Sequence, residues 1–547
     1  MARRVLIVGG VAGGASAAAR LRRLDEAAQI LMFERGQHIS FANCGLPYYV
    51  GGTIKRREDL LLQTPESFRQ RFNVDVRVNN EVVAIDRSKK EVDILDLTTR
   101  NKYVESYDQL ILSAGAEPVR PAIAGIDCDR VFTLRNVADV DRIVEFIGKE
   151  SPRRAVVVGA GYIGLEMAEN LRARGLSVEV VEMLDQVMPG LDKEMAWFLE
   201  QDLVKHNVAL RLGDGVCSFE QNGSSLNVKL NSGGELSCDF AMLTVGVRPE
   251  VKLAREANLE IGKQGGIKVN EYLQTSDPNI YAIGDAVEVR DFVLGGTTLV
   301  PLAGPANKQG RMVADNICGM KRKYNGTQGT AILKLFDLTA AMTGASEKAL
   351  AKTNIEYEKI YTHSVNHADY YPGARMMHIK LLFSKPEGRI LGAQIVGGDG
   401  VDKRIDVLAV AIRAGMTVFD LQELELAYAP PYGSGKDPVN IVGFAAANIL
   451  EGKVRIKHCS EIEQDDFMLD VRTPTEFARD ALPDAINVPL GSLRDKLSEL
   501  PRNRTIHAYC GVGLRSYIAC RILEQNGFDV KNLSGGYLTY LTTESTT

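Results

Sequence analysis

Two strand–glycine–helix segments constrain the fold of this chain more than any other feature of its sequence. In the first segment, an apolar run at 5–8 enters a glycine-rich turn at 9–14, and an alanine-rich stretch follows. This pattern predicts a strand, a tight turn and a helix. A second apolar run ends at Glu34, about 20 residues beyond the turn, which is the layout of a dinucleotide-binding βαβ unit.

The residue types in this unit suit a dinucleotide for physical reasons. Glycines let the backbone approach a pyrophosphate closely, and the free N–H groups at the start of the helix bind its charge. The acid that ends the second strand accepts hydrogen bonds from ribose hydroxyls. One position departs from the full glycine pattern, because Val11 stands between Gly9 and Gly14 where the middle glycine is expected.

The second segment matches the glycine pattern completely through Gly159, Gly161 and Gly164. Glu182 ends the apolar run that follows, and a carboxylate there would bind an unmodified ribose and repel a 2′-phosphate. No arginine follows within the next few residues to receive such a phosphate. The sequence therefore favours NADH over NADPH.

A third motif identifies the family. The stretch 275–288 reads as a strand that ends in Gly284 and Asp285, and the similar segments 112–118 and 243–249 look like crossings between two domains. In their order and spacing, these motifs resemble those of the pyridine nucleotide–disulfide oxidoreductases. The resemblance implies that the carboxylate of Asp285 accepts a hydrogen bond from the ribityl chain of FAD.

The resemblance covers the first three domains of an α/β protein with two Rossmann-like nucleotide-binding domains and an α+β dimerisation domain. The implied boundaries are 1–115 and 245–322 for the FAD-binding domain, 116–244 for the NAD-binding domain and 323–453 for the dimerisation domain of a homodimer. FAD and NADH are the implied cofactors. The implied cofactor-binding residues are Gly9, Gly10, Gly14, Glu34, Arg35, Gly115, Gly159, Gly161, Gly164, Glu182, Gly284, Asp285 and Pro301.

Cys44 is the predicted redox centre. Many members of this family carry the pair CxxxxC beside the flavin, but the segment 40–52 contains Cys44 alone. This segment resembles the single-cysteine branch, which includes coenzyme A-disulfide reductases and NADH oxidases and peroxidases. Because Cys44 has no partner in its segment, it must cycle through a mixed disulfide with a small thiol or through a sulfenic acid.

Basic and polar residues indicate that coenzyme A is the small thiol. Ser16, Arg20 and Arg23 are spaced by three or four along the predicted helix and can share one face, where cations suit the phosphates of CoA. Positions matching these contact CoA in the coenzyme A-disulfide reductases. The resemblance implies the following CoA-binding residues: Ser16, Arg20, Arg23, Ser40, Asn43, Arg71, Asn307 and Lys436.

Two aromatic segments strengthen the match to the coenzyme A-disulfide reductases. One contains Tyr370 and Tyr371, and the other contains Tyr428 and Tyr432. In that branch a tyrosine from each segment reaches the partner subunit's active site, and the register of the motifs favours Tyr370 and Tyr428. A phenol there can hydrogen-bond a sulfur or give a proton to a departing thiolate. The alternative is that the tyrosines only pack at a dimer interface.

The stretch 457–547 is predicted to form an additional α/β domain. A strand ends at Asp470, Thr473 and Glu476 have the spacing of a capping box, and an apolar strand leads through Cys510 into a helix. These features resemble a rhodanese. Backbone N–H groups and the helix N-terminus stabilise a persulfide anion on such a cysteine, and Arg515 adds a cation. The loop is short, as in rhodaneses, which favours sulfur transfer over phosphate chemistry.

Together these parts predict an NADH-dependent persulfide, polysulfide or CoA-disulfide reductase, with Cys44, Cys510, Tyr370, Tyr428 and Arg515 as catalytic residues. With a CoA persulfide, the Cys44 thiolate would attack the CoA-side sulfur and expel hydrosulfide, while Cys510 carries sulfane sulfur. The runner-up is a CoA-disulfide reductase whose rhodanese acts independently. The residues also allow an NADH oxidase with a Cys44 sulfenic acid, or a non-enzymatic thiol-redox sensor.

Composition limits the partners and the compartment. The formal net charge of -5 offers no basic field for nucleic acid. No run of about 18 apolar residues predicts a membrane span. None of the 8 cysteines forms a CxxC pair, which argues against a disulfide framework or a zinc site and for a reducing, cytoplasmic compartment. The expected partners are therefore small thiols and a second copy of the chain, and no metal is expected.

Overall fold

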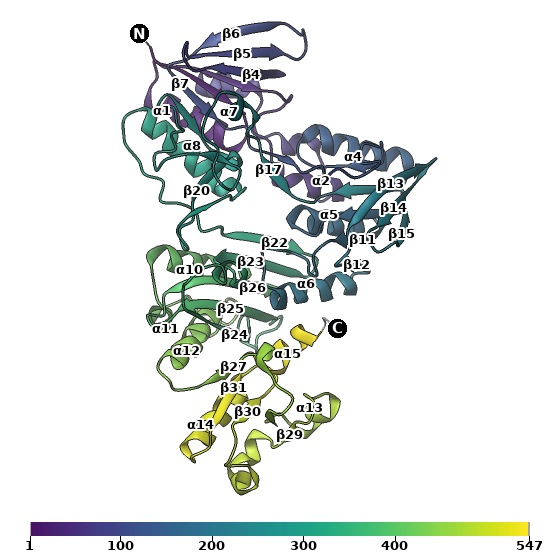
Figure 1. The fold of residues 1–547 in the computed structure, drawn as a ribbon, viewed down its shortest axis with the longest axis vertical. Coiled ribbons are helices and arrows are strands. Elements are labelled where there is room, and N and C mark those ends of the chain that lie inside the picture. Colours follow the sequence, from purple (N-terminus) through teal and green to yellow (C-terminus); the bar gives the residue numbers. More distant parts are fainter. Residues whose placement is uncertain (1, 545–547) are drawn as a thin grey trace. The chain divides into compact units, whose positions relative to one another are not determined.

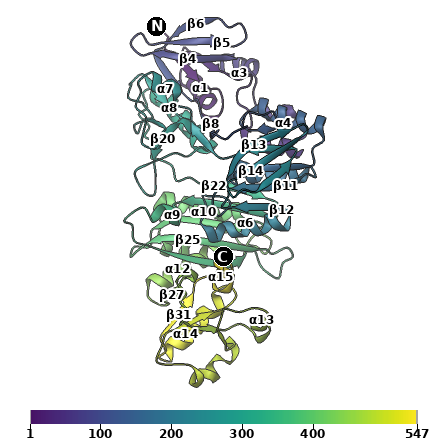
Figure 2. The ribbon, with the colours of Figure 1, turned by 45° about the vertical axis from the view of Figure 1, so that its right-hand side comes forward.

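The structure is a computed structural model that describes residues 2–544 and separates into two compact units. Unit 1 comprises Met1–Asp185 and Asn207–Gly329, and unit 2 comprises Gln186–His206 and Thr330–Thr547. Figures 1 and 2 show the chain coloured from the N-terminal strands of unit 1 to the C-terminal helix of unit 2.

The first sheet of unit 1 is five-stranded and entirely parallel, in the order β19-β7-β1-β2-β3. Its strands are β1 (Arg4–Val8), β2 (Gln29–Glu34), β3 (Asp75–Val78), β7 (Gln109–Leu112) and β19 (Ile280–Ala282). Helix α1 (Ala12–Leu24) follows β1, and α8 (Ala303–Ile317) lies beside α1 (Figure 1). The two helices approach so closely that a Cβ on Gly310 would lie 2.4 Å from the carbonyl oxygen of Gly13.

The second sheet of unit 1 repeats this construction in the order β12-β11-β10-β16-β9, again entirely parallel. Its strands are β9 (Val131–Phe132), β10 (Arg154–Val158), β11 (Ser177–Glu182), β12 (Val208–Leu212) and β16 (Phe240–Leu243). Helix α5 (Tyr162–Ala173) connects β10 to β11, and α4 (Val137–Glu150) precedes β10. Each parallel sheet therefore contains one of the two predicted strand–glycine–helix–strand units.

Small antiparallel elements complete unit 1. Two three-stranded sheets are formed by β4 (Asn80–Asp86), β5 (Glu91–Asp96) and β6 (Lys102–Ser106), and by β13 (Val216–Asn222), β14 (Ser225–Leu230) and β15 (Glu235–Cys238). The two predicted crossings pair with each other, because β8 (Ala116–Pro118) runs antiparallel to β17 (Val247–Pro249). The short helices are η1 (Asn43–Gly45), α2 (Leu46–Gly51), η2 (Arg57–Leu60), α3 (Pro65–Phe72), α7 (Lys252–Glu256) and η3 (Gly284–Ala286). The remaining short strands are β18 (Ile267–Lys268), β20 (Val287–Arg290) and β21 (Thr297–Thr298).

Unit 2 contains an antiparallel five-stranded sheet in the order β22-β23-β26-β25-β24. Its strands are β22 (Ala331–Leu335), β23 (Leu338–Gly344), β24 (Tyr357–Val365), β25 (Met376–Ser384) and β26 (Ile390–Gly397). The helices that pack on this sheet are α6 (Lys193–Lys205), α10 (Val401–Ala414) and α12 (Pro438–Leu450). Helix α11 (Val418–Glu423) packs on α12, and α9 (Glu347–Leu350) lies between β23 and β24 in the sequence. Strand β26 is buried along its whole length and is apolar except for Gln394, whose side-chain amide donates to the Asp192 carboxylate at 2.7 Å.

The C-terminal part of unit 2 is a parallel sheet in the order β27-β31-β30-β28-β29. Its strands are β27 (Ile456–Lys457), β28 (Phe467–Asp470), β29 (Ile486–Asn487), β30 (Ile506–Tyr509) and β31 (Val530–Leu533). The helices are η4 (Cys459–Glu461), α13 (Pro474–Arg479), η5 (Leu490–Glu499), α14 (Leu514–Gln525) and α15 (Gly536–Glu544). A hydrogen bond joins this domain to the antiparallel sheet: Nε2 of His363 in β24 lies 2.8 Å from Oγ1 of Thr539 in α15.

These sheets confirm the predicted α/β fold class with its two Rossmann-like sheets, an α+β domain and a C-terminal α/β domain. The capping box predicted at Thr473 and Glu476 is formed at the start of α13. Within residues 2–544, no helix has both the length and the apolar character that a membrane span requires.

Candidate functional site

The two glycine turns of unit 1 build the same cradle twice. Gly9 and Gly159 both adopt a left-handed backbone, with φ of 96° and 101°. A Cβ on Gly14 or Gly164 would lie 1.9 Å from the carbonyl oxygen of Gly9 or Gly159, respectively, so both helix starts require glycine. Val11 precedes α1 with φ of -95°, outside the left-handed region that favours glycine, so the structure accommodates a side chain at this position of the glycine pattern.

The acids that end β2 and β11 are held in the same way. The carboxylate of Glu34 accepts hydrogen bonds from the amides of Gly10 at 2.9 Å and Gly36 at 2.8 Å. The carboxylate of Glu182 accepts from the amides of Ala160 at 2.7 Å and Leu184 at 2.9 Å. Each carboxylate is thereby fixed beside a glycine turn, where a ribose diol fits it. A Cβ built on Gly161 would have no described atom within 4 Å, so the space beside this glycine is open to a pyrophosphate.

Asp285 lies in η3 with its backbone fixed by α8, because the amide of Gly284 donates to Oε1 of Gln309 at 2.7 Å. Burial raises the pKa of the Asp285 carboxyl, and the guanidinium of Arg135, 3.7 Å away, acts in the opposite direction. Among residues 2–544, no group donates a hydrogen bond to this carboxylate. A partly buried acceptor without a donor fits the hydroxyls of the FAD ribityl chain.

The other predicted cofactor residues have less specific surroundings. Arg35 is exposed and lies 3.6 Å from the carboxylate of Glu250. Gly115 has φ of 77°, and a Cβ there would lie 2.8 Å from the Arg135 guanidinium. Pro301 is exposed just before α8.

Cys44 lies in η1 with a solvent-exposed side chain and a free thiol. Partial burial raises the pKa of this thiol, the carboxylates of Glu166 and Asp285 raise it further, and the guanidinium of Arg135 lowers it. With the amide of Asn43 turned so that its oxygen faces the guanidinium, Asn43 accepts from Nη1 of Arg135 and donates to its carbonyl oxygen, both at 2.8 Å. Arg135 therefore holds the residue next to Cys44.

Glu166 and Tyr48 form a hydrogen-bonded pair near Cys44. The Tyr48 hydroxyl donates to Oε1 of Glu166 at 3.5 Å, between α2 and α5. Burial raises the pKa of Glu166 to about 7 and that of Tyr48 to about 12. The sequence analysis did not single out Glu166, Tyr48 or Arg135. Glu166 could have been found as the acid that follows the last glycine of the second turn by two residues.

The residues predicted to bind CoA divide between the two units. In unit 1, the Ser16 hydroxyl donates to Oδ1 of Asn307, and Nε of Arg20 donates to Oδ1 of Asp315 at 2.8 Å. Ser16 and Arg20 of α1 thus both face α8, and Arg20 shares its charge with Asp315. Arg23 is exposed one turn further along α1. The structure therefore brings Ser16, Arg20 and Asn307 together at this helix pair.

The remaining residues predicted to bind CoA lie elsewhere. Ser40 has φ of 45°, and its backbone bonds the carbonyl of Gly10 and the amide of Leu62. Arg71 is exposed at the end of α3, with its guanidinium 5.4 Å from the ring centre of Phe72. Lys436 is exposed in unit 2.

The predicted tyrosines meet in unit 2. The hydroxyls of Tyr370 and Tyr428 lie 3.0 Å apart, whereas Tyr371 and Tyr432 are exposed and outside this pair. Buried Arg404 joins the two loops: its Nη2 donates to Asp437 at 2.7 Å and to the carbonyls of Asn366 and Tyr432 at 2.8 and 3.4 Å. The sequence analysis did not single out Arg404, because its partners are distant along the chain.

Cys510 follows β30 directly, and its side chain is fully buried. Its Sγ accepts from the amide of Gly513 at 3.2 Å and from the Ser516 hydroxyl at 3.5 Å. Its carbonyl accepts from the amide of Tyr537 at 2.7 Å, at the start of α15. Arg515 forms an ion pair with Glu476. The structure thus brings together Cys510, Arg515 and the acid of the capping box.

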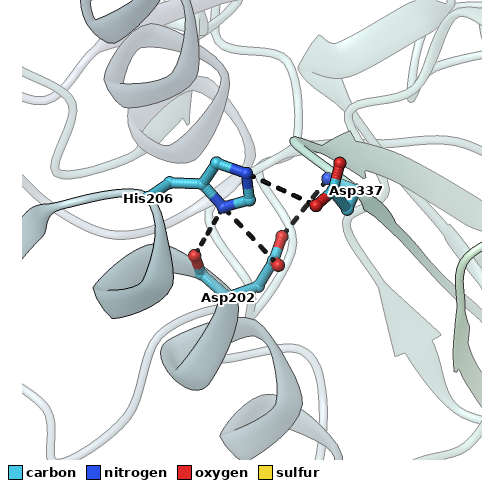
Figure 3. Close-up of side chains that lie close together, drawn as sticks. All are labelled: Asp202, His206 and Asp337. Carbon is cyan, nitrogen blue, oxygen red and sulfur yellow. Dashed lines mark hydrogen bonds and ion pairs between the residues drawn. The ribbon is translucent and has the colours of Figure 1, made fainter.

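One group among residues 2–544 has ligand atoms close enough to hold a metal ion, with all of them within 4.8 Å: Asp202, His206 and Asp337 (Figure 3). Nδ1 of His206 lies 2.8 Å from the carbonyl oxygen of Asp202, and Nε2 lies 3.5 Å from the carboxylate of Asp337. The ammonium of Lys205 already lies 2.8 Å from the same carboxylate. The group is therefore an ion-pair network at the end of α6, and we assign it no metal.

Comparison with known proteins gives three family matches along the chain. Residues 3–310 match the family described as pyridine nucleotide-disulphide oxidoreductase, and residues 330–436 match its dimerisation domain. Residues 457–542 match the rhodanese-like domain.

Individual proteins are similar over most of the chain. The coenzyme A disulfide reductase of Staphylococcus haemolyticus is 38% identical over 448 residues, which is 82% of this chain and 100% of that protein. The structure of reduced Bacillus anthracis CoADR-RHD is 51% identical with a TM-score of 0.97, over 99% of this chain and 98% of that chain. The NAD-dependent persulfide reductase from A. fulgidus is 38% identical with a TM-score of 0.93, over 98% of this chain and 100% of that chain.

Proposed function

This chain belongs to the pyridine nucleotide-disulphide oxidoreductase family, and we propose that it uses NADH to reduce sulfur–sulfur bonds of coenzyme A, in CoA persulfide or CoA disulfide, through Cys44. The observation that carries the proposal is the setting of Cys44. Its free, exposed thiol lies beside the carboxylate of the predicted FAD site and has no cysteine partner in its segment. Its partner must therefore arrive as a small thiol compound.

The two glycine cradles fit FAD at the Gly9 turn and NADH at the Gly159 turn, with Glu34 and Glu182 as the ribose acceptors. Bound FAD supplies the transfer of two electrons from NADH to sulfur. The chain's own contribution is to hold both nucleotides, to orient Cys44 through Asn43 and Arg135, and to bind CoA at the α1 and α8 pair.

Cys44 is the nucleophile in the proposed reaction. Its thiolate attacks the CoA-side sulfur of a CoA persulfide, the sulfur–sulfur bond breaks, and hydrosulfide leaves. The product is a Cys44–CoA mixed disulfide, which takes up two electrons and one proton to give CoA thiol and the Cys44 thiolate. With CoA disulfide as substrate, the first leaving group is CoA thiolate and the second half of the reaction is the same.

The tyrosine pair completes the site in a homodimer. The match to a dimerisation domain supports the homodimer, and we place Tyr370 and Tyr428 of one subunit beside the partner subunit's Cys44. There a phenol would protonate the departing sulfur.

Cys510 carries sulfane sulfur in this proposal. Its buried sulfur faces the amide of Gly513 and the hydroxyl of Ser516, two donors that suit a persulfide anion. A CoA thiolate would attack the outer sulfur of the Cys510 persulfide, so that the Cys510 thiolate leaves and CoA persulfide forms. A reducing cytoplasmic compartment suits a chain whose thiols must stay free.

Product analysis tests the proposal. The FAD-loaded protein is given NADH and CoA persulfide, and hydrosulfide and CoA thiol are measured. The proposal requires release of both at the rate of NADH oxidation, abolished by Cys44→Ser. Cys217→Ser, which removes another exposed thiol, is the matched control and should keep full activity.

Two outcomes would change this proposal. Reduction of CoA disulfide without hydrosulfide release from the persulfide would remove CoA persulfide as a substrate and leave a CoA-disulfide reductase with an independent rhodanese, the activity named for the Staphylococcus relative. Rapid NADH oxidation by oxygen alone, without either sulfur substrate, identifies an oxidase and contradicts the proposal.

A further inference from the structure

Arg515 is the one cation in the Cys510 loop, and it is already engaged by a carboxylate. Its Nη1 donates to Oε2 of Glu476 at 2.8 Å, and its Nη2 donates to Oε1 at 2.6 Å. This is the two-pronged arrangement that makes an arginine–carboxylate pair strong and directional. Both side chains are about one third exposed, 36% and 38%, so they face whatever approaches the loop from solvent.

Glu476 is fixed independently of Arg515. It is the third residue of α13, and its Oε2 also accepts hydrogen bonds from the amide and the hydroxyl of Thr473, at 3.0 and 2.8 Å. The hydrogen bonds from Arg515 hold the pKa of Glu476 well below its usual range. The acid is therefore charged at neutral pH, and the Arg515–Glu476 pair carries no net charge.

The rest of the Cys510 surroundings is uncharged or internally paired. The loop residues 511–514 are Gly, Val, Gly and Leu, and Leu514 is 65% exposed. The nearby ions Asp470 and Arg472 are both buried and bonded to each other. The sulfur of Cys510 accepts hydrogen bonds from the amide of Gly513 and the hydroxyl of Ser516. Arg515 also interacts with this sulfur, but its positive charge is already balanced by the Glu476 carboxylate.

We propose that Glu476 is a specificity-determining residue: it neutralises Arg515, so that Cys510 takes sulfane sulfur from the persulfide of an organic thiol and not from a dianionic donor such as thiosulfate. This inference rests on the proposed function, because it assumes that Cys510 carries sulfur. It goes further in naming the chemical class of the donor and the residue that selects it.

The two donors place different demands on the loop. In the accepted reaction, the Cys510 thiolate attacks the outer sulfur of R–S–SH, the sulfur–sulfur bond breaks, and the monoanion R–S⁻ leaves Cys510–S–SH behind. In the rejected one, the thiolate attacks the outer sulfur of thiosulfate and expels the sulfite dianion, leaving Cys510–S–S⁻. The second path brings three negative charges together beside the Glu476 carboxylate, and the Arg515–Glu476 pair offers no net positive charge to offset them.

The test measures loading of Cys510 in the full-length, FAD-loaded protein without NADH. The protein is mixed with thiosulfate or with an alkyl persulfide, and the reaction is stopped with an alkylating agent. Mass spectrometry then shows whether the peptide that contains Cys510 has gained the mass of one sulfur atom. The variants are Glu476→Gln, Arg515→Gln and the double variant. Gln also forms capping boxes at this position, so Glu476→Gln keeps α13. Asp420→Asn, at the equivalent position of the α11 capping box, is the matched control.

We expect the wild type to load from the persulfide and very slowly from thiosulfate, and Glu476→Gln to accelerate thiosulfate loading by about tenfold or more. The double variant should lose that gain, because the freed guanidinium causes it, and Asp420→Asn should behave as the wild type.

Two results overturn the inference. The first is that the wild type loads at comparable rates from both donors. The second is that thiosulfate loading in Glu476→Gln is the same as in the wild type. In either case, loading from the persulfide would leave the sulfur-carrying role of Cys510 intact. Absence of loading from either donor in every variant removes that role as well, and thereby separates a failure of the proposed function from a failure of this inference alone.

Discussion

The hydroxyl oxygens of Tyr370 and Tyr428 lie 3.0 Å apart, although the two residues belong to separate loops of unit 2. The hydrogen bond with Tyr428 raises the pKa of Tyr370, so this phenol keeps its proton at neutral pH. Both side chains are largely exposed, at 72% and 51%. Of two hydrogen-bonded phenols, one can give its proton to a departing sulfur and take a proton from the other, which is the role proposed for this pair.

The first prediction concerns this pair. Tyr370→Phe and Tyr428→Phe should each lower kcat for CoA persulfide by about 100-fold, because each removes one member of a proton-donating pair. The double variant should be little worse than either single variant, since the two act as a unit. Tyr432→Phe, which changes a tyrosine outside the pair, is the control. Additive losses in the double variant would show that the phenols act separately.

The second prediction concerns the charges around Cys44. Arg135→Gln removes the guanidinium that lowers the pKa of the thiol, and Glu166→Gln removes a carboxylate that raises it. At a fixed pH just above neutral, alkylation of Cys44 should therefore be several-fold slower in Arg135→Gln and several-fold faster in Glu166→Gln. The pH profile of the alkylation rate should shift to higher pH in Arg135→Gln and to lower pH in Glu166→Gln. Shifts of the same sign in both variants would contradict this electrostatic account.

The third prediction follows from the buried carboxyl of Glu166. Burial raises its pKa from the ordinary 4.5 to about 7 in the folded chain, so folding favours the protonated form. This contribution to stability is fully present below pH 4.5 and is lost as the pH rises through 7. The Tm should therefore fall between these values more steeply in the wild type than in Glu166→Gln. Glu145→Gln, at an exposed position of α4, should retain the wild-type slope.

Local backbone demands made much of unit 1 predictable. The positive φ at Gly9 and Gly159, and the close approach at Gly14 and Gly164, can be met only by glycine, so the pattern appears directly in the sequence. The capping box of α13 is equally local. These features depend on residues within a few positions of one another, and sequence reading resolves them for that reason.

Ion pairs between distant segments could not be predicted in the same way. Arg20, Arg22 and Arg23 look alike in sequence, but Arg22 is buried, and its guanidinium donates to five backbone carbonyl oxygens, those of Phe72, Asp25, Glu26, Ala28 and Asn73. Glu476 and Arg515 meet only because α13 and α14 pack in one domain. Which arginine is structural, which is paired and which is free follows from the tertiary fold, so the predicted roles of Arg20, Arg23 and Arg515 stay predictions.

The last prediction tests whether Arg404 holds the tyrosine loops in place. Arg404 is 2% exposed, and its fork bonds Asp437 and the carbonyls of Asn366 and Tyr432, which flank the loops of Tyr370 and Tyr428. Arg404→Lys keeps the positive charge but loses the planar guanidinium, whose several N–H groups bond these partners at once. It should lower kcat for CoA persulfide while leaving NADH-driven reduction of a one-electron dye unchanged, because dye reduction needs no tyrosine.

Arg22→Lys is the matched control for that measurement, because it also replaces a buried, multiply bonded arginine but lies in unit 1. Both variants should lower the Tm, since each leaves buried oxygens with fewer donors, typically at a cost of about 1–3 kcal/mol per unsatisfied group. Only Arg404→Lys should lower the ratio of persulfide to dye turnover. If both variants lowered that ratio equally, loss of stability alone would account for the effect, and Arg404 would have no specific role in positioning Tyr370 and Tyr428.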